Sequence, residues 1–116
     1  MDKVVLFQET TVQYLTKAKE RINTKDKWIK ECLAQDINGK RTDHRSNDAY
    51  SFCIIGTLLN KYDYGNKNHS IGYNYMIDTI ISYNFSSLVD FNNSPHITHE
   101  DIMKTFDVAI EKSYNS

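Results

Sequence analysis

The closest pair of histidines in the sequence is His96-x-x-His99, and paired imidazoles are a frequent feature of metal sites. Zinc normally takes three or four protein ligands, so Asp90, Glu100 or Asp101 would have to complete the set. No His-Glu-x-x-His pattern is present to support that arrangement. A surface imidazole and local helix capping explain the pair better, so we predict neither a metal site nor a cofactor.

The sequence also lacks the usual signatures of nucleophilic catalysis. No serine lies in a Gly-x-Ser-x-Gly elbow, and neither Cys32 nor Cys53 has a local sequence typical of a catalytic thiol. Gly65 and Gly72 lie in no Walker or dinucleotide pattern, so a loop that cradles phosphate is not indicated. We therefore predict a protein without enzymatic activity, with both cysteines reduced.

One catalytic alternative stays open. Asp36, Asn92 and His99 would form the cleft of a small enzyme if the fold brought them together near Trp28. The four residues are far apart in the sequence, so only the tertiary structure distinguishes such a cleft from four unrelated positions.

Tyrosine accounts for eight of the fourteen aromatic residues, and several tyrosines lie close together in a stretch rich in asparagine. Tyrosine provides a large contact area at low entropic cost, as binding surfaces require. An AT-rich coding bias explains the composition as well, so the clustering alone supports a binding role. The predicted partner-binding tyrosines are Tyr62, Tyr64, Tyr73 and Tyr75.

Charge is distributed unevenly along the chain. Fourteen basic and fifteen acidic residues give a net charge of −1, which excludes a uniformly cationic nucleic-acid binder. Residues 17–45 nevertheless carry nine basic and five acidic residues, so this segment has a net charge of +4. A solvated helix face with a loop is one explanation, and a nucleic-acid-binding patch is the alternative. The basic residues that such a patch, or a protein-binding surface, would use are Lys25, Lys27, Lys30, Arg41 and Arg45.

The composition is that of an average globular protein, with 40% apolar and 25% charged residues. No apolar run approaches the ~18 residues that a membrane span needs, and the N-terminal residues do not resemble a secretory signal. We expect one cytoplasmic domain over residues 1–116, with no membrane partner.

Apolar residues recur mostly at helical spacing, which predicts an all-α, compact single domain of four to five helices. Thr10-x-x-Gln13 is typical of a capping box at the start of the first helix. Thr98 with Asp101 indicates the start of the last helix in the same way. Asp36-Ile-Asn-Gly39 is typical of a turn, which leaves room for a short hairpin near residues 33–42.

Three further helices are predicted between these ends. A short helix is expected to begin at Thr24 and to carry Trp28 on its apolar side. A central helix should begin near Ser46, with Gly56 allowing a neighbouring helix to approach closely. A helix capped by Ser70 should follow.

Several of these residues and short motifs follow one another in a characteristic order along the chain. The order is Trp28, Leu33-Ala34-x-Asp36-x-x-Gly39, Ala49-x-x-x-Cys53-x-x-Gly56-x-Leu58-Leu59, Phe91-Asn92-Asn93, Thr98-His99-Glu100-Asp101-Ile102 and Asp107-x-Ala109-Ile110. Over about residues 8–113 the chain resembles a small, uncharacterised domain family of bacteria and their phages. The resemblance implies an all-helical fold and a cytoplasmic setting, and it implies no activity.

The chain departs from that family's pattern at three positions. Thr57 replaces an alanine, Phe91 replaces a tryptophan, and Asn93 replaces an aspartate. If the aspartate has a chemical role in the family, this chain lacks it.

These observations favour a non-enzymatic protein-binding module encoded by a phage or mobile element. Its most concrete form is a regulator or inhibitor of a host protein, such as a component of a bacterial defence system. A nucleic-acid-binding protein that uses residues 17–45 is the alternative, and a small enzyme is the second alternative. Self-association as a homodimer also remains open.

Overall fold

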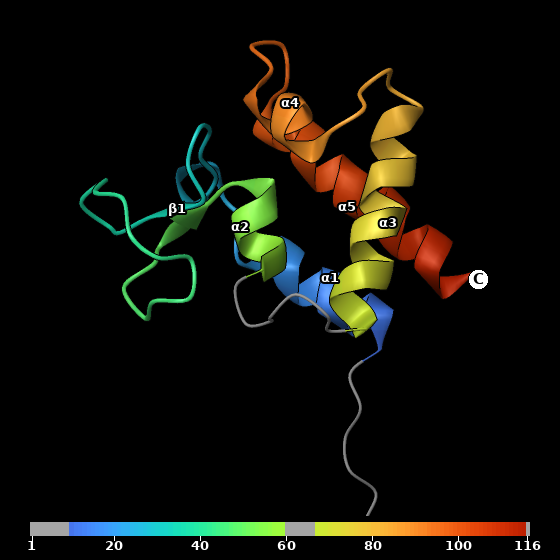
Figure 1. Ribbon diagram of the computed structural model, residues 1–116, viewed down its shortest axis with the longest axis horizontal. Helices are drawn as coiled ribbons and strands as arrows, with labels where there is room; N and C mark the ends of the chain where they lie inside the picture. Colours follow the sequence, from blue (N-terminus) through green and yellow to red (C-terminus); the bar gives the residue numbers. More distant parts are fainter. Residues whose placement is uncertain (1–9, 60–66, 116) are drawn as a thin grey trace, which may run out of the picture.

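The structure is a computed structural model that describes residues 10–59 and 67–115 (Figure 1). This part of the chain contains five α-helices, which confirms the prediction of a mostly helical fold with four to five helices. The helices are α1 (Thr11–Glu20), α2 (Ile54–Leu59), α3 (Lys67–Ile81), α4 (Leu88–Asn93) and α5 (His99–Tyr114). A 3-10 helix, η1 (Lys25–Lys27), and the two strands β1 (Ala34–Gln35) and β2 (Ser51–Phe52) complete the elements.

The three long helices α1, α3 and α5 pack against one another and supply most of the apolar core. Both predicted capping boxes are present, because Thr10 and Thr98 each exchange hydrogen bonds with the residue three positions later. The fully buried core residues from these helices are Tyr14, Leu15, Ala18, Met76, Ile80, Ile102, Phe106 and Ala109. The short helices α2 and α4 pack against each other beside this core.

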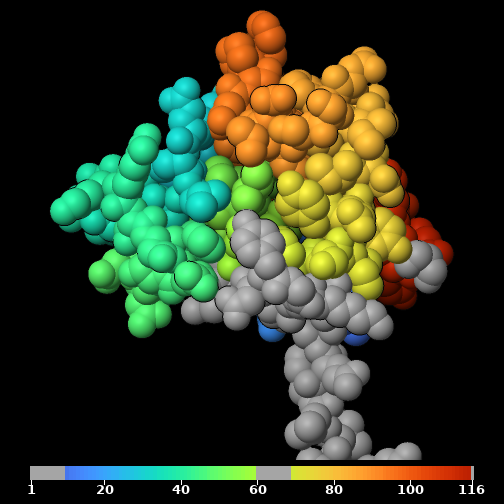
Figure 2. All heavy atoms as spheres, in the orientation of Figure 1, coloured from blue at the N-terminus to red at the C-terminus, as the bar shows by residue number. Residues whose placement is uncertain are grey.

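The predicted hairpin near residues 33–42 is confirmed. Gly39 adopts a φ of +83°, and the Asp36 amide donates to the Lys40 carbonyl at 2.8 Å. Gln35 forms an antiparallel bridge with Arg41 across the turn. Residues 34–50 form a lobe beside the helices, coloured cyan to green in Figure 2.

Two predicted helices are wrong over part of their length, because strand pairing replaces them. The backbone after η1 is extended at Trp28, and the Ile29 amide donates to the Phe52 carbonyl at 3.1 Å. The helix predicted from Ser46 begins only at Ile54, since Phe52 lies in β2 and pairs antiparallel with β1. Contacts between distant segments thus override the local helical periodicity.

The predicted cap at Ser70 is also wrong, because α3 begins three residues earlier, at Lys67. The first turn of α3 is attached to the core through His69. Its Nδ1 lies 2.8 Å from the buried hydroxyl of Tyr14, which donates to the Leu58 carbonyl at 2.5 Å. Burial lowers the pKa of His69, so this imidazole is neutral at pH 7.

Gly56 allows a close approach, as predicted, but the neighbour is not a helix. A Cβ atom at Gly56 would lie 1.9 Å from the backbone oxygen of Leu33, the residue directly before β1. The absence of a side chain therefore lets α2 rest directly on the backbone that leads into the hairpin.

We predict that Gly56→Ala costs about 3 kcal/mol or more, because backbone atoms of Leu33 cannot move aside cheaply. Gly39→Ala is the matched control: nothing lies near its Cβ position, and only left-handed strain of about 1–2 kcal/mol is expected. Urea denaturation compares the two variants. A Gly56→Ala cost no larger than the Gly39→Ala cost would contradict the close backbone contact.

Candidate functional site

The side chain of Asn92, in α4, is buried and makes four hydrogen bonds. Its Oδ1 accepts from the indole nitrogen of Trp28 at 2.8 Å and from the amide of Ile54 at 3.0 Å. Its Nδ2 donates to the Ile29 carbonyl and to Oδ1 of Asn93, both at 3.1 Å. Asn92 thus joins α4 to the segment after η1 and to the first residue of α2, whose amide has no partner within that helix.

Asn93, the last residue of α4, and Ser94, which caps it, extend this connection. Oδ1 of Asn93 accepts from the backbone amide of Glu31 at 2.8 Å. The carbonyl of Ser94 accepts from the ammonium of Lys30 at 2.7 Å. We call the hydrogen-bonded set formed by Asn92, Asn93 and Ser94 with residues 28–31 and Ile54 the asparagine clamp.

Glu31 adopts a left-handed backbone conformation, with a φ of +68°. A residue with a Cβ atom pays about 1–2 kcal/mol for this conformation, which glycine adopts freely. The bond from its amide to Asn93 holds the strained backbone in place, while its carboxylate is exposed. Strain of this kind often marks a functional position.

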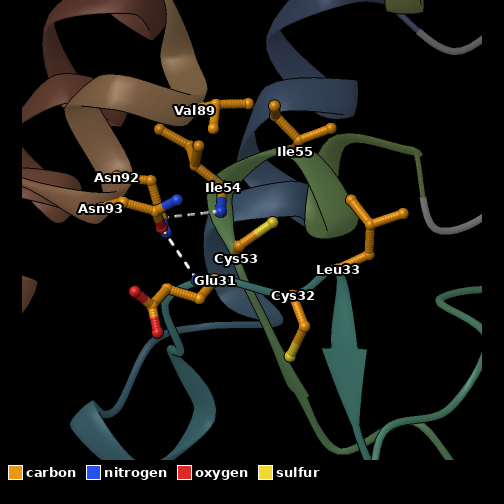
Figure 3. A pocket seen from close by; sticks show the side chains of 9 residues that line it. All are labelled: Glu31, Cys32, Leu33, Cys53, Ile54, Ile55, Val89, Asn92 and Asn93. Carbon is orange, nitrogen blue, oxygen red and sulfur yellow. Dashed lines mark hydrogen bonds between the residues drawn. The ribbon is translucent and has the colours of Figure 1, made fainter.

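The clamp borders an apolar cavity of about 220 Å³ (Figure 3). Figure 3 shows Asn92 and Asn93 on one side of it and Leu33 on the other. The residues that line the cavity are Glu31, Cys32, Leu33, Cys53, Ile54, Ile55, Val89, Asn92 and Asn93. Two of the aliphatic side chains are well exposed, Leu33 at 41% and Val89 at 50%, so the cavity is open to solvent at an apolar rim.

The two cysteines of the cavity are free thiols. Burial raises the pKa of Cys53, so this thiol is protonated at pH 7 and is a poor nucleophile. Its sulfur accepts a hydrogen bond from the Gly56 amide at 3.3 Å and so caps the start of α2. Cys53 therefore has a structural role.

The comparisons place the chain in a family. A family model described as a family of unknown function, DUF6197, matches residues 7–112. The chain belongs to DUF6197. This membership agrees with the resemblance to a small, uncharacterised domain family. The family's description assigns no function. No curated protein and no solved structure matches the chain.

In this DUF6197 member, the three departures noted in the sequence have structural explanations. The Thr57 hydroxyl is buried and donates to the Ala18 carbonyl at 2.6 Å. Phe91 is fully buried, with its ring centroid 5.2 Å from that of Phe85. Asn93 uses Oδ1 to accept hydrogen bonds, which an aspartate does equally well.

The predicted catalytic cleft is only partly assembled. The rings of Trp28 and His99 lie 6.2 Å apart, and Asn92 binds the same indole. Nε2 of His99 lies 2.6 Å from the Ile22 carbonyl, so this nitrogen is a donor that anchors α5 to the segment just after α1. Asp36 instead accepts from the amides of Asn38 and Lys40 within the hairpin turn. The three residues that meet are thus held in structural hydrogen bonds, and the carboxylate of the proposed set is engaged elsewhere.

The structure describes two of the four tyrosines that were predicted to bind a partner. Tyr73 and Tyr75, on α3, are half-buried and pack against the core, which leaves part of each ring for a partner. Tyr62 and Tyr64 lie outside the described residues.

The predicted basic residues occupy different environments. The ammonium of Lys30 lies 5.4 Å from the Trp28 ring centroid in addition to its bond with Ser94. Arg45 forms an ion pair with Asp43 at 3.7 Å. Lys25 and Arg41 are exposed, whereas Lys27 is half-buried and lies 5.9 Å from the centroid of the Tyr50 ring.

Among residues 10–59 and 67–115, no three histidine, cysteine or acidic side chains are grouped closely enough to hold a metal ion. No helix in the same residues is both long and apolar enough to cross a membrane.

Leu33 and Val89, the two rim residues of the cavity, were not among the residues predicted to bind a partner. The exposure of Val89 could have been predicted from the sequence. Leu88 and Phe91 share the buried face of α4 at helical spacing, and Val89 lies off that face. The exposure of Leu33 could not have been predicted, because an exposed leucine beside a strand looks the same in sequence as a buried one.

We predict that the same chemical change destabilises the protein at one position and has little effect at the adjacent one. Asn92→Asp places a carboxylate oxygen where Nδ2 now donates to the Ile29 carbonyl, which should cost about 2–4 kcal/mol. Asn93→Asp keeps the accepting oxygen and should change stability by less than about 1 kcal/mol. Urea denaturation followed by the fluorescence of Trp28 measures both, and equal costs would contradict the assigned bonds.

Proposed function

We propose that this protein is a non-enzymatic protein-binding module whose apolar cavity receives a side chain of its partner. The observation that supports this most strongly is the cavity of about 220 Å³ with exposed Leu33 and Val89 at its rim. The volume suits one aliphatic or aromatic side chain. Apolar side chains buried in central pockets supply much of the binding energy at protein interfaces.

The charge at the rim specifies the partner further. The exposed carboxylate of Glu31 belongs to the cavity lining, whereas Lys30 beside it is turned to the Ser94 carbonyl. A partner segment with a large apolar residue next to a lysine or arginine would complement both features. The left-handed backbone of Glu31 is a stability cost that a binding role explains.

The effect of this protein on its partner is predicted from the sequence alone. Regulation or inhibition of a host protein, such as a defence component, stays a prediction, as do phage origin and a cytoplasmic setting. The nucleic-acid alternative has weaker support, because Lys30 and Arg45 are already engaged with groups of this chain.

We predict that Val89→Asp weakens partner binding at least about tenfold, since a carboxylate would have to be desolvated at the rim. Ile81→Asp is the matched control: Ile81, at the end of α3, is 55% exposed but does not line the cavity. Ligands are first selected from a displayed peptide library, and their affinities for the two variants and the parent protein are then measured by calorimetry.

The expected ligands carry an apolar residue beside a basic one, and they bind the Ile81→Asp variant as tightly as the parent protein. The proposal fails if no such peptides are selected, or if Val89→Asp and Ile81→Asp change the affinity equally.

We predict that Glu31→Gly raises stability while it lowers peptide affinity. Relief of the left-handed strain outweighs the added freedom of the unfolded chain by about 0.5–1 kcal/mol. Glu31→Gln separates the two effects, because it removes the charge and keeps the strain. Denaturation and calorimetry should show weaker binding in both variants and higher stability only in the glycine variant. Unchanged affinity in both would remove Glu31 from the proposed site.

A further inference from the structure

A second hollow lies between the C-terminal end of α1, η1 and β2, and it differs in chemistry from the cavity beside the asparagine clamp. Its volume is about 340 Å³. The residues that line it are Arg21, Lys27, Ser46, Asn47, Ala49, Tyr50 and Phe52. The lining thus contains two cationic side chains, two small polar side chains and two aromatic rings, and it contains no carboxylate.

Both cations are held in place by contacts within the fold. Nη1 of Arg21 donates to the Thr57 carbonyl at 3.0 Å, which fixes the guanidinium group at the hollow. The ammonium of Lys27 lies 5.9 Å from the centroid of the Tyr50 ring, and Lys27 forms no ion pair with the described residues. Positioned cations lose little side-chain entropy when an anion binds.

Asp26, which lies beside Lys27 in η1, accepts hydrogen bonds from two hydroxyl groups. The hydroxyls of Thr24 and Tyr50 both donate to Asp26, the former at 2.5 Å. These two hydrogen bonds, with the charge of Lys27, hold the pKa of Asp26 below its ordinary value. The bond to Asp26 also fixes the orientation of the Tyr50 ring in the wall of the hollow.

We infer that this hollow binds a small phosphate ester with a planar organic group, such as a nucleoside monophosphate. Arg21 and Lys27 face the phosphate, and the Ser46 hydroxyl and the Asn47 amide add donors. The hollow is several times larger than a phosphate group, and Tyr50, Phe52 and Ala49 offer apolar surface to the rest of the ligand.

The test is a titration of the full-length protein with adenosine monophosphate and, separately, with adenosine, followed by NMR of the backbone amides. The monophosphate should shift the amides of Asn47, Tyr50 and Phe52, and added salt should weaken the binding. Adenosine should cause no such shifts at up to ~10 mM.

Lys27→Gln should weaken monophosphate binding about threefold to tenfold. Lys25→Gln is the matched control, because Lys25 lies in the same 3-10 helix and does not line the hollow. The inference is overturned if the monophosphate causes no shifts at ~10 mM, or if the two variants bind equally well. It is also overturned if a single-stranded oligonucleotide binds far more tightly and loses affinity equally in both variants, since this would indicate a diffuse nucleic-acid surface.

Discussion

The buried amide of Asn92 is the interaction on which the arrangement around the cavity depends. One side chain satisfies the indole of Trp28, the first amide of α2 and the carbonyl of Ile29, which belong to two segments far apart along the chain. Each of these groups would be costly to bury unpaired, so removing the amide affects all three at once. A buried network of this kind specifies one arrangement because every member is satisfied.

The apolar cavity follows from the same constraint. The clamp holds α4 against residues 28–31, while Gly56 lets α2 rest on the backbone of Leu33. The side chains between these two fixed contacts do not fill the remaining volume, and Val89 and Leu33 stay at its rim. The binding site that we propose is thus the space left between two backbone contacts. The long helices α1, α3 and α5 pack against one another in the main core.

Local signals in the sequence were sufficient for some elements and insufficient for others. The caps at Thr10 and Thr98 and the turn at Gly39 depend on a few neighbouring residues, and all three were predicted correctly. The extended backbone at Trp28 depends on pairing with Phe52, which no local pattern encodes. Asn92 was singled out in the sequence, but its role could not be assigned, because three of its four partners lie 38 to 64 positions away along the chain.

The most direct test of the clamp is the hydrogen exchange of two groups that share Oδ1 of Asn92, the indole N–H of Trp28 and the amide N–H of Ile54. NMR follows both, and the indole signal is unambiguous because the sequence contains one tryptophan. If the clamp is one cooperative unit, both protons should exchange with the same opening free energy, equal to that of global unfolding. An indole proton that exchanges through a local opening much easier than that of Ile54 would contradict the account.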